Sequence, residues 1–98
     1  KELIQLGKRK KGIPIEIEFE IRNSGRALLE INKMEGSCSC TVINQEEFIL
    51  KPGETKKIKA EINTEQMFGE ERKTITVFSN AEPKKKNLMV LFEIIENK

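Results

Sequence analysis

Strict alternation of apolar and acidic side chains over residues 13–22 constrains the fold of this chain most strongly. The apolar positions are Ile13, Ile15, Ile17, Phe19 and Ile21, and the acidic ones between them are Glu16, Glu18 and Glu20. A period of two residues places each set on one face of a β-strand, whereas a helix would scatter both sets around its circumference. The stretch therefore predicts a half-buried strand with one solvated, acidic face.

Shorter apolar runs separated by turn residues predict further strands along the chain. The run 3–6, closed by Gly7, predicts a first edge strand that ends in a basic turn over 8–12. Further strands are predicted at 27–34, 37–43 (as a strand or bulged extension), 48–50, 56–62, 74–79 and 88–95. The longest connection, 63–72, offers at most a single helical turn at 64–67, and its residues 67–69 are expected to pack over one end of the core.

Turn chemistry between these runs is specific. Asn23-Ser24-Gly25-Arg26 combines side chains that bond their own backbone with a conformationally free glycine. Lys51-Pro52-Gly53-Glu54 matches a type II turn, with proline second and glycine third. The pattern predicts one domain over residues 1–98, an all-β, immunoglobulin-like β-sandwich of about seven antiparallel strands with Greek-key crossings. The predicted core is Ile15, Ile17, Phe19, Ile21, Leu29, Ile31, Ile58, Ile62, Ile75, Val77, Val90 and Phe92.

Composition excludes several function classes. The chain has no histidine, which removes His-based metal sites, Ser-His-Asp triads and Cys-His dyads. No nucleophile–base arrangement remains, so we expect no enzyme of ordinary type. A net charge of +2 and the lack of an exposed aromatic platform argue against nucleic acid. No apolar run is long enough to predict a transmembrane segment.

Basic residues cluster locally despite the low net charge. The clusters are Lys8-Arg9-Lys10-Lys11, Lys56-Lys57 and Lys84-Lys85-Lys86. In a sandwich, the first and last clusters are expected at opposite ends, whereas Arg26, Lys51 and residues 84–86 can share one end. Such a patch serves either solubility and edge protection or association with an anionic envelope surface.

Both cysteines lie in one short motif, Cys38-Ser39-Cys40. On a regular strand, residues i and i+2 are roughly 6.6 Å apart, too far for a disulfide, so bonding requires a bulge or turn. Three interpretations follow from the residues: buried thiols, a soft-metal site for copper, or a strained redox-active disulfide. Met34, Met67 and Met89 are possible third ligands in a metal site that contains Cys38 and Cys40.

Beyond these single patterns, the chain resembles a bacterial family, domain of unknown function 1573, over about residues 7–95. The matching positions are Phe19, Asn23, Gly25, Leu29, Ile31, Ser37, Cys38, Cys40, Thr41, Pro52, Gly53, Glu54, Ser79 and Asn80. One position departs from the pattern, because Ser39 stands where the family usually has glycine. Serine resists backbone conformations that glycine adopts freely, which argues against a tight turn at the cysteine pair.

The resemblance implies an immunoglobulin-like domain, similar to those of cilia, centrosome and sperm-motility proteins, and no established activity. It also implies export, often within a lipoprotein or cell-envelope protein, so we expect an extracytoplasmic location. The chain starts at Lys1 without a signal segment, as an excised or processed piece would. The expected function is a non-catalytic interaction module with an unidentified protein partner and possible association with the cell envelope. The alternative is copper binding or thiol redox chemistry at Cys38 and Cys40.

Overall fold

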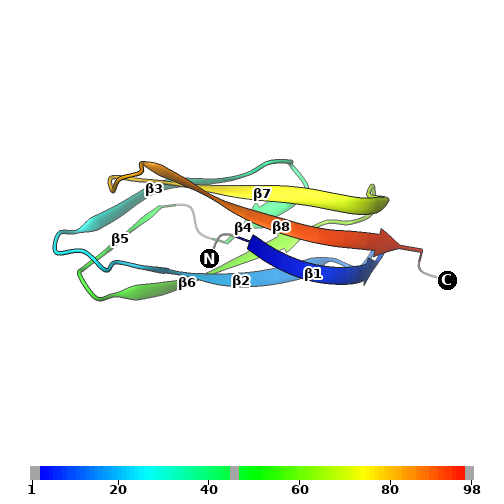
Figure 1. Cartoon of the computed structure of the whole chain (residues 1–98), viewed down its shortest axis with the longest axis horizontal. Coiled ribbons are helices and arrows are strands. Elements are labelled where there is room, and N and C mark those ends of the chain that lie inside the picture. The colour runs from blue at the N-terminus through cyan, green and yellow to red at the C-terminus, as the bar shows by residue number, and fades with distance from the viewer. Residues whose placement is uncertain (1–2, 45–46, 97–98) are drawn as a thin grey trace.

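A computed structural model describes residues 3–44 and 47–96 as two β-sheets packed face to face in an elongated molecule of 51 × 20 × 18 Å (Figure 1). Its strands are β1 (Leu3–Lys10), β2 (Ile15–Arg22), β3 (Leu29–Gly36), β4 (Thr41–Ile43), β5 (Phe48–Leu50), β6 (Thr55–Ile62), β7 (Gly69–Ser79) and β8 (Lys85–Ile95). Each predicted strand has a counterpart, so the total is eight rather than about seven. Residues 45–46, between the predicted strands 37–43 and 48–50, lie outside the described part of the chain.

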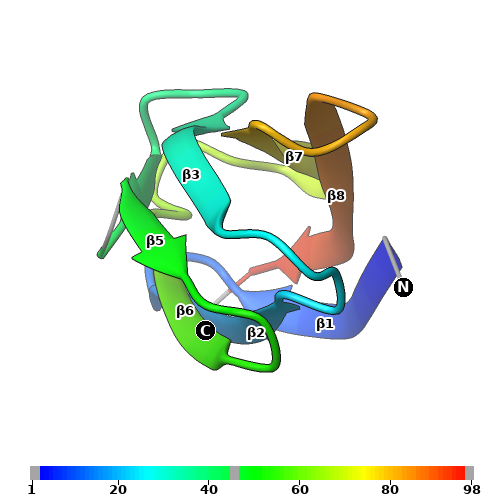
Figure 2. The same ribbon diagram turned by 90° about the vertical axis from the view of Figure 1, so that its left-hand side faces the viewer.

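The chain crosses between the sheets at almost every connection. One sheet has the strand order β1-β8-β7-β3-β5 and the other the order β2-β6-β4. Only β7 and β8, joined by a hairpin, are successive strands of the same sheet, and Figure 2 shows the two sheets as opposite walls of the molecule. This crossing pattern confirms the immunoglobulin-like sandwich.

Strand β1 corrects two predictions. Gly7 does not end the strand: with φ at +71° it lies where the β1–β8 register shifts, and the strand continues through Lys8 to Lys10. Glycine tolerates this left-handed conformation without steric cost, which makes the bulge possible. In addition, β1 pairs with β8 in parallel, so the sandwich is not wholly antiparallel.

The core lies between the sheets and follows the predicted alternation. Eight of the twelve predicted core residues are buried. The other four, Phe19, Ile21, Leu29 and Val77, are half-buried because they lie at one open end. Met34, Leu50, Ala60, Met67, Leu88 and Ile94 are buried as well. Burying this much apolar surface supplies the main driving force for folding.

The connection from β6 to β7 closes the opposite end. A turn is formed by Met67 N donating to Thr64 O at 3.1 Å, in place of the single helical turn predicted there. Met67 is buried as predicted, but Phe68 is 67% exposed and does not cover the core. The Phe68 ring instead lies under the ammonium of Lys11, 3.3 Å from its centroid. Because β7 begins at Gly69, the connection is shorter than predicted.

Candidate functional site

A groove opens at the end of the sandwich where three connections meet. These connections are the loop 23–28, the turn 51–54 and the hairpin turn 80–84 (Figures 1 and 2). The groove has a volume of about 640 Å³ and is lined by β2, the loop 23–28, the start of β3, and the ends of β7 and β8 that meet at the hairpin. Here the inter-sheet space is not completely filled, so the half-buried part of the core is accessible.

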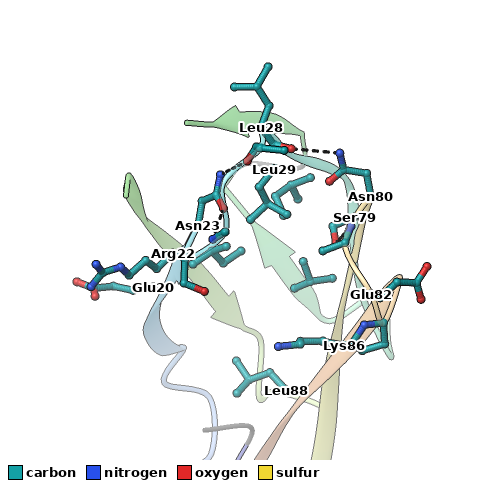
Figure 3. Close-up of a pocket in the computed structure, with 18 of the residues that line it drawn as sticks. Glu20, Arg22, Asn23, Leu28, Leu29, Ser79, Asn80, Glu82, Lys86 and Leu88 are labelled. Carbon is teal, nitrogen blue, oxygen red and sulfur yellow. Dashed lines mark hydrogen bonds between the residues drawn. The ribbon is translucent and has the colours of Figure 1, made fainter. Parts of the chain in front are cut away.

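The groove has an apolar floor. Its apolar lining comes from both sheets and comprises Phe19, Ile21, Leu29, Ile31, Val77 and Leu88. Figure 3 shows Leu88 directed from β8 into the groove, while Leu28, 50% exposed, points away at the rim. Apolar surface that remains open to solvent in this way favours a binding function.

Charged groups of both signs border the floor, and one of them, Lys86, reaches over it (Figure 3). The groove is bordered by Arg22, Arg26 and Lys86 and by two carboxylates, Glu20 and Glu82. Figure 3 shows Lys86 reaching into the groove, whereas Glu20 and Glu82 point out to solvent. The prediction that Arg26 and the last basic cluster share one end is confirmed, and Lys8 to Lys10 lie at the far end of β8.

Asn23 holds one rim of the groove together. Its buried side chain, 4% exposed, donates to Ala27 O at 2.8 Å and to Leu50 O at 2.9 Å. Its Oδ1 accepts from Gly25 N at 3.0 Å, and its backbone bonds the turn 51–54 through Gly53 N and Glu54 O. That turn has the predicted form: Glu54 N donates to Lys51 O, and Gly53, which follows Pro52, has φ at +88°. These motif residues are therefore structural.

Asn80 plays the same part on the opposite rim. Its Oδ1 accepts from Glu30 N at 2.9 Å and its Nδ2 donates to Leu28 O at 3.2 Å. The amide thereby extends the pairing of β3 beyond the last β7 residue. Ser79 closes the hairpin, since its N donates to Lys84 O and its Oγ accepts from Ala81 N. Asn23 and Asn80 together fix both ends of the segment that leads into β3.

The cysteine pair lies away from the groove, at the other end of β3. Cys38 and Cys40 form a disulfide within a turn closed by Thr41 N donating to Cys38 O at 3.2 Å. The predicted strand over 37–43 is therefore wrong in its first half, and only Thr41–Ile43 forms β4. Both cysteines are half-buried, and Cys40 packs against the larger core cluster. Of the three sequence interpretations, the structure shows the bonded pair, and the turn supplies the geometry that a regular strand lacks.

Ser39 does not prevent this turn. No non-glycine residue of the described chain has a positive φ, so Ser39 needs no left-handed conformation. The tight contact falls on Gly36 instead, where an added Cβ would lie 2.7 Å from Thr41 Cβ. Ser37 anchors the turn to β7, because its N donates to Thr74 O and its Oγ accepts from Thr74 N. Ser37 and Thr41 are therefore structural as well.

Metal binding at Cys38 and Cys40 stays a prediction. Thiolates, not disulfide sulfurs, bind copper, so binding would first require reduction of this bond. Met67 is buried in the larger core cluster, against which Cys40 packs, Met34 is buried in the smaller cluster, and Met89 is exposed. The described residues contain no group of three or more His, Cys, Asp and Glu side chains arranged to hold a metal ion.

Sequence comparison assigns the family. The profile of the family described as a protein of unknown function, DUF1573, matches residues 1–94. The chain belongs to this family. No curated protein matches its sequence. The turn that holds the two cysteines and the groove rims held by asparagine side chains are thus features of a DUF1573 domain.

Solved structures confirm the fold of this DUF1573 domain. A Porphyromonas gingivalis W83 protein of unknown function superposes with a TM-score of 0.78 at 19% identity, covering 94% of this chain and 44% of that one. PapD-like domain 7 of human CEP192 gives 0.72 at 11% identity, with 99% and 83% covered. The periplasmic chaperone SfaE gives 0.66 at 10% identity, with 99% and 56% covered. At these identities the likeness concerns the fold alone.

Two features of the site were not predicted from the sequence. The groove is lined by residues from both sheets and from connections that are distant in the sequence, an arrangement that no local pattern indicates. The inward direction of Lys86 could be predicted from strand periodicity, because Lys86 lies two and four residues from the buried positions Leu88 and Val90. The described residues contain no helix long and apolar enough to cross a membrane.

Proposed function

We propose that this chain is a non-catalytic interaction module of an extracytoplasmic, envelope-associated bacterial protein, and that its protein partner binds the groove between the loop 23–28 and the β7–β8 hairpin. The observation that carries the proposal is an apolar floor bordered by charged groups, with Lys86 reaching over it, at one end of a rigid sandwich. Protein interfaces combine an apolar centre with a polar rim in this way. Connections at the end of a sandwich commonly carry recognition because the sheets hold them rigidly.

Rigidity of the groove supports this role. Asn23 and Asn80 fix its two rims through side-chain bonds to backbone groups far away in the sequence. A pre-organised site loses less conformational entropy when it binds. Motif residues therefore both line the groove and fix its rims.

The disulfide supports the extracytoplasmic part of the proposal. Disulfides persist in oxidising compartments such as the bacterial periplasm and are rare in the cytosol. Thiol labelling of the native protein, trapped in acid directly from cells, tests this. We expect Cys38 and Cys40 to react with a maleimide only after reduction; free thiols in the native protein would contradict the proposed location.

Lysine-directed cross-linking tests where the partner binds. The groove end carries Lys51 and Lys84–Lys86, whereas the opposite end carries Lys8, Lys10 and Lys11, so cross-links report on the end that is used. After cross-linking in an envelope fraction and mass spectrometry, we expect partner peptides on the groove-end lysines.

A pair of matched variants completes this experiment. Arg26→Glu/Lys86→Glu reverses two charges at the groove, and Lys8→Glu/Lys10→Glu reverses two at the far end. We expect the first to lose the partner and the second to retain it. Equal retention by both variants, or cross-links concentrated on the far end, would overturn the proposal.

A further inference from the structure

The turn that holds Cys38 and Cys40 lies at the opposite end of β3 from the groove, so the proposed function does not use it. Its disulfide closes a loop that spans only residues 38–40, and so short a loop restricts the unfolded chain little. A fold that gains little stability from a disulfide also holds that disulfide only weakly against reduction, because the two effects are thermodynamically linked. The bond is therefore better suited to a role that opens it than to a structural one.

Hydrogen bonds hold the turn without help from the disulfide. On one side, Ser37 N donates to Thr74 O at 2.8 Å and Ser37 Oγ accepts from Thr74 N at 3.0 Å. On the other side, Asn63 N donates to Cys40 O at 2.8 Å. Reduction of the disulfide removes none of these hydrogen bonds. The two thiols therefore stay within one turn after reduction and can bond again.

Each sulfur of the disulfide has a hydrogen-bond donor beside it. Cys40 N donates to Cys38 Sγ at 3.2 Å. Thr41 Oγ1 lies 3.9 Å from Cys40 Sγ, and the hydroxyl is the donor because a disulfide sulfur carries no hydrogen. A donor in this position stabilises the negative charge of a thiolate when the sulfur is released. Both sulfurs can therefore leave as thiolates when the disulfide opens.

The surroundings of the two sulfurs differ. Both cysteines are half-buried, and the neighbours of Cys38 in the sequence, Ser37 and Ser39, are exposed. Among the described residues, Cys40 packs against the larger core cluster, whereas Cys38 is grouped with neither cluster. Access is one of the factors that decide which sulfur of a disulfide is attacked. Cys38 is therefore the sulfur that an incoming thiolate reaches first.

We propose that the Cys38–Cys40 disulfide is a thiol–disulfide exchange site that accepts two electrons from a dithiol of another protein. A thiolate of that dithiol attacks Cys38 Sγ, so that a mixed disulfide forms and Cys40 leaves as a thiolate beside the Thr41 hydroxyl. The second partner thiolate then attacks the partner sulfur of the mixed disulfide, and Cys38 leaves as a thiolate that accepts from Cys40 N. The partner is oxidised to a disulfide, the domain is reduced to a dithiol, and the two partner protons pass through solvent to the departing thiolates.

Reduction of the folded domain in glutathione buffers tests this exchange. Structural disulfides resist reduction by glutathione, whereas labile ones exchange with it. The oxidised domain is incubated without denaturant at graded ratios of reduced to oxidised glutathione, quenched in acid, and labelled with a maleimide for mass spectrometry. We expect reversible conversion between the disulfide and the dithiol, with an unchanged circular dichroism spectrum. A pair that is reduced only in urea, or whose reduction unfolds the domain, would overturn the inference.

Single-cysteine variants test which sulfur reacts first. Cys40→Ser leaves Cys38 as the only thiol, and Cys38→Ser leaves Cys40. With oxidised glutathione as the probe, we expect Cys40→Ser to form the mixed disulfide about tenfold faster than Cys38→Ser, because of access and the Cys40 N–H donor. Urea unfolding of both variants controls for loss of fold. Equal rates, or the reverse order, would overturn the assignment of Cys38 as the attacked sulfur.

The donor to Cys40 is tested at Thr41. Thr41→Val removes the hydroxyl but keeps the methyl groups that face Gly36, and Thr41→Ser keeps the hydroxyl as the matched control. With reduced thioredoxin as the protein dithiol, we expect Thr41→Val to be reduced about tenfold more slowly than the unsubstituted domain and Thr41→Ser at a similar rate to it. Equal rates for all three proteins would overturn the route in which Cys40 leaves first. None of these measurements involves the groove, so the inference and the proposed function stand or fall separately.

Discussion

Two asparagine side chains, Asn23 and Asn80, hold the rims of the groove in place. Asn23 is buried and satisfies three backbone groups from two separate connections. Buried polar groups that lose their hydrogen-bond partners keep the full cost of desolvation. Replacement of Asn23 is therefore expected to lower stability through groups that are distant from it in the sequence. The sequence marked Asn23 as a turn residue, but its bond to Leu50 O becomes visible only in the folded chain.

Replacement of Asn23 is expected to be costly. Asn23→Ala removes donors to Ala27 O and Leu50 O, and we expect a loss of about 2–4 kcal/mol in the free energy of unfolding, measured in urea. The control is Asn44→Ala, which removes an exposed bond to Lys59 N and should cost about 1 kcal/mol or less. Equal losses for the two variants would show that Asn23 does not staple the rim.

The disulfide is expected to contribute little to stability. Its loop spans only residues 38–40, and closing so short a loop restricts the unfolded chain only slightly. We expect Cys38→Ser/Cys40→Ser to remain folded and to lose about 1–2 kcal/mol in the free energy of unfolding. Thermal unfolding followed by circular dichroism is sufficient to measure this; an unfolded double variant would assign the pair a dominant structural role.

At the scale of elements, the end opposite the groove is closed by one threonine. The Thr64 hydroxyl, 1% exposed, accepts from Gly12 N at 2.9 Å and donates to Ile13 O at 3.1 Å. It therefore ties the β1–β2 turn to the β6–β7 connection. The two ends of the sandwich thus differ. The end at Thr64 is closed by hydrogen bonds, whereas the other end is open as a groove.

Removal of this tie tests the closure. Thr64→Val keeps the side-chain volume but leaves Gly12 N and Ile13 O without their partner, and we expect a loss of about 1–3 kcal/mol in the free energy of unfolding. Thr55→Val, at the exposed start of β6, serves as the matched control and should change stability by about 0.5 kcal/mol or less. A Thr64→Val variant as stable as the control would contradict the assigned role.

The sequence predicted elements best where side chains alternate. Strands β6 and β8 follow from period-two patterns that burial confirms, and β5 has the predicted bounds. The pattern of β2 holds only from Ile15 onward, because Ile13 is 51% exposed and lies before the strand. Glycine misled the prediction at β1, because Gly7 was interpreted as a stop although a bulge absorbs it within the strand. The turn at 37–40 was missed because its residue types also suit a strand, and only the contact between Gly36 and Thr41 distinguishes the two.

In the whole molecule, three connections that are separate in the sequence lie together at one end of the sandwich. The loop 23–28, the turn 51–54 and the hairpin 80–84 meet at one end, and the prediction that their basic residues would share an end was correct. The groove itself could not be predicted, because its lining comes from both sheets and from loops that are distant in the sequence. The proposed binding groove thus lies at one end of the sandwich, and the cysteine motif lies in the turn beyond β3.

The central claim is that a partner occupies the groove end. Amide hydrogen exchange tests it most directly, measured on the free domain and on the domain saturated with the partner identified by cross-linking. We predict slower exchange in the bound state over 19–28 and 85–88, and unchanged exchange over 8–13 and 63–68 at the closed end. Protection confined to the closed end, with none along the groove, would contradict this account.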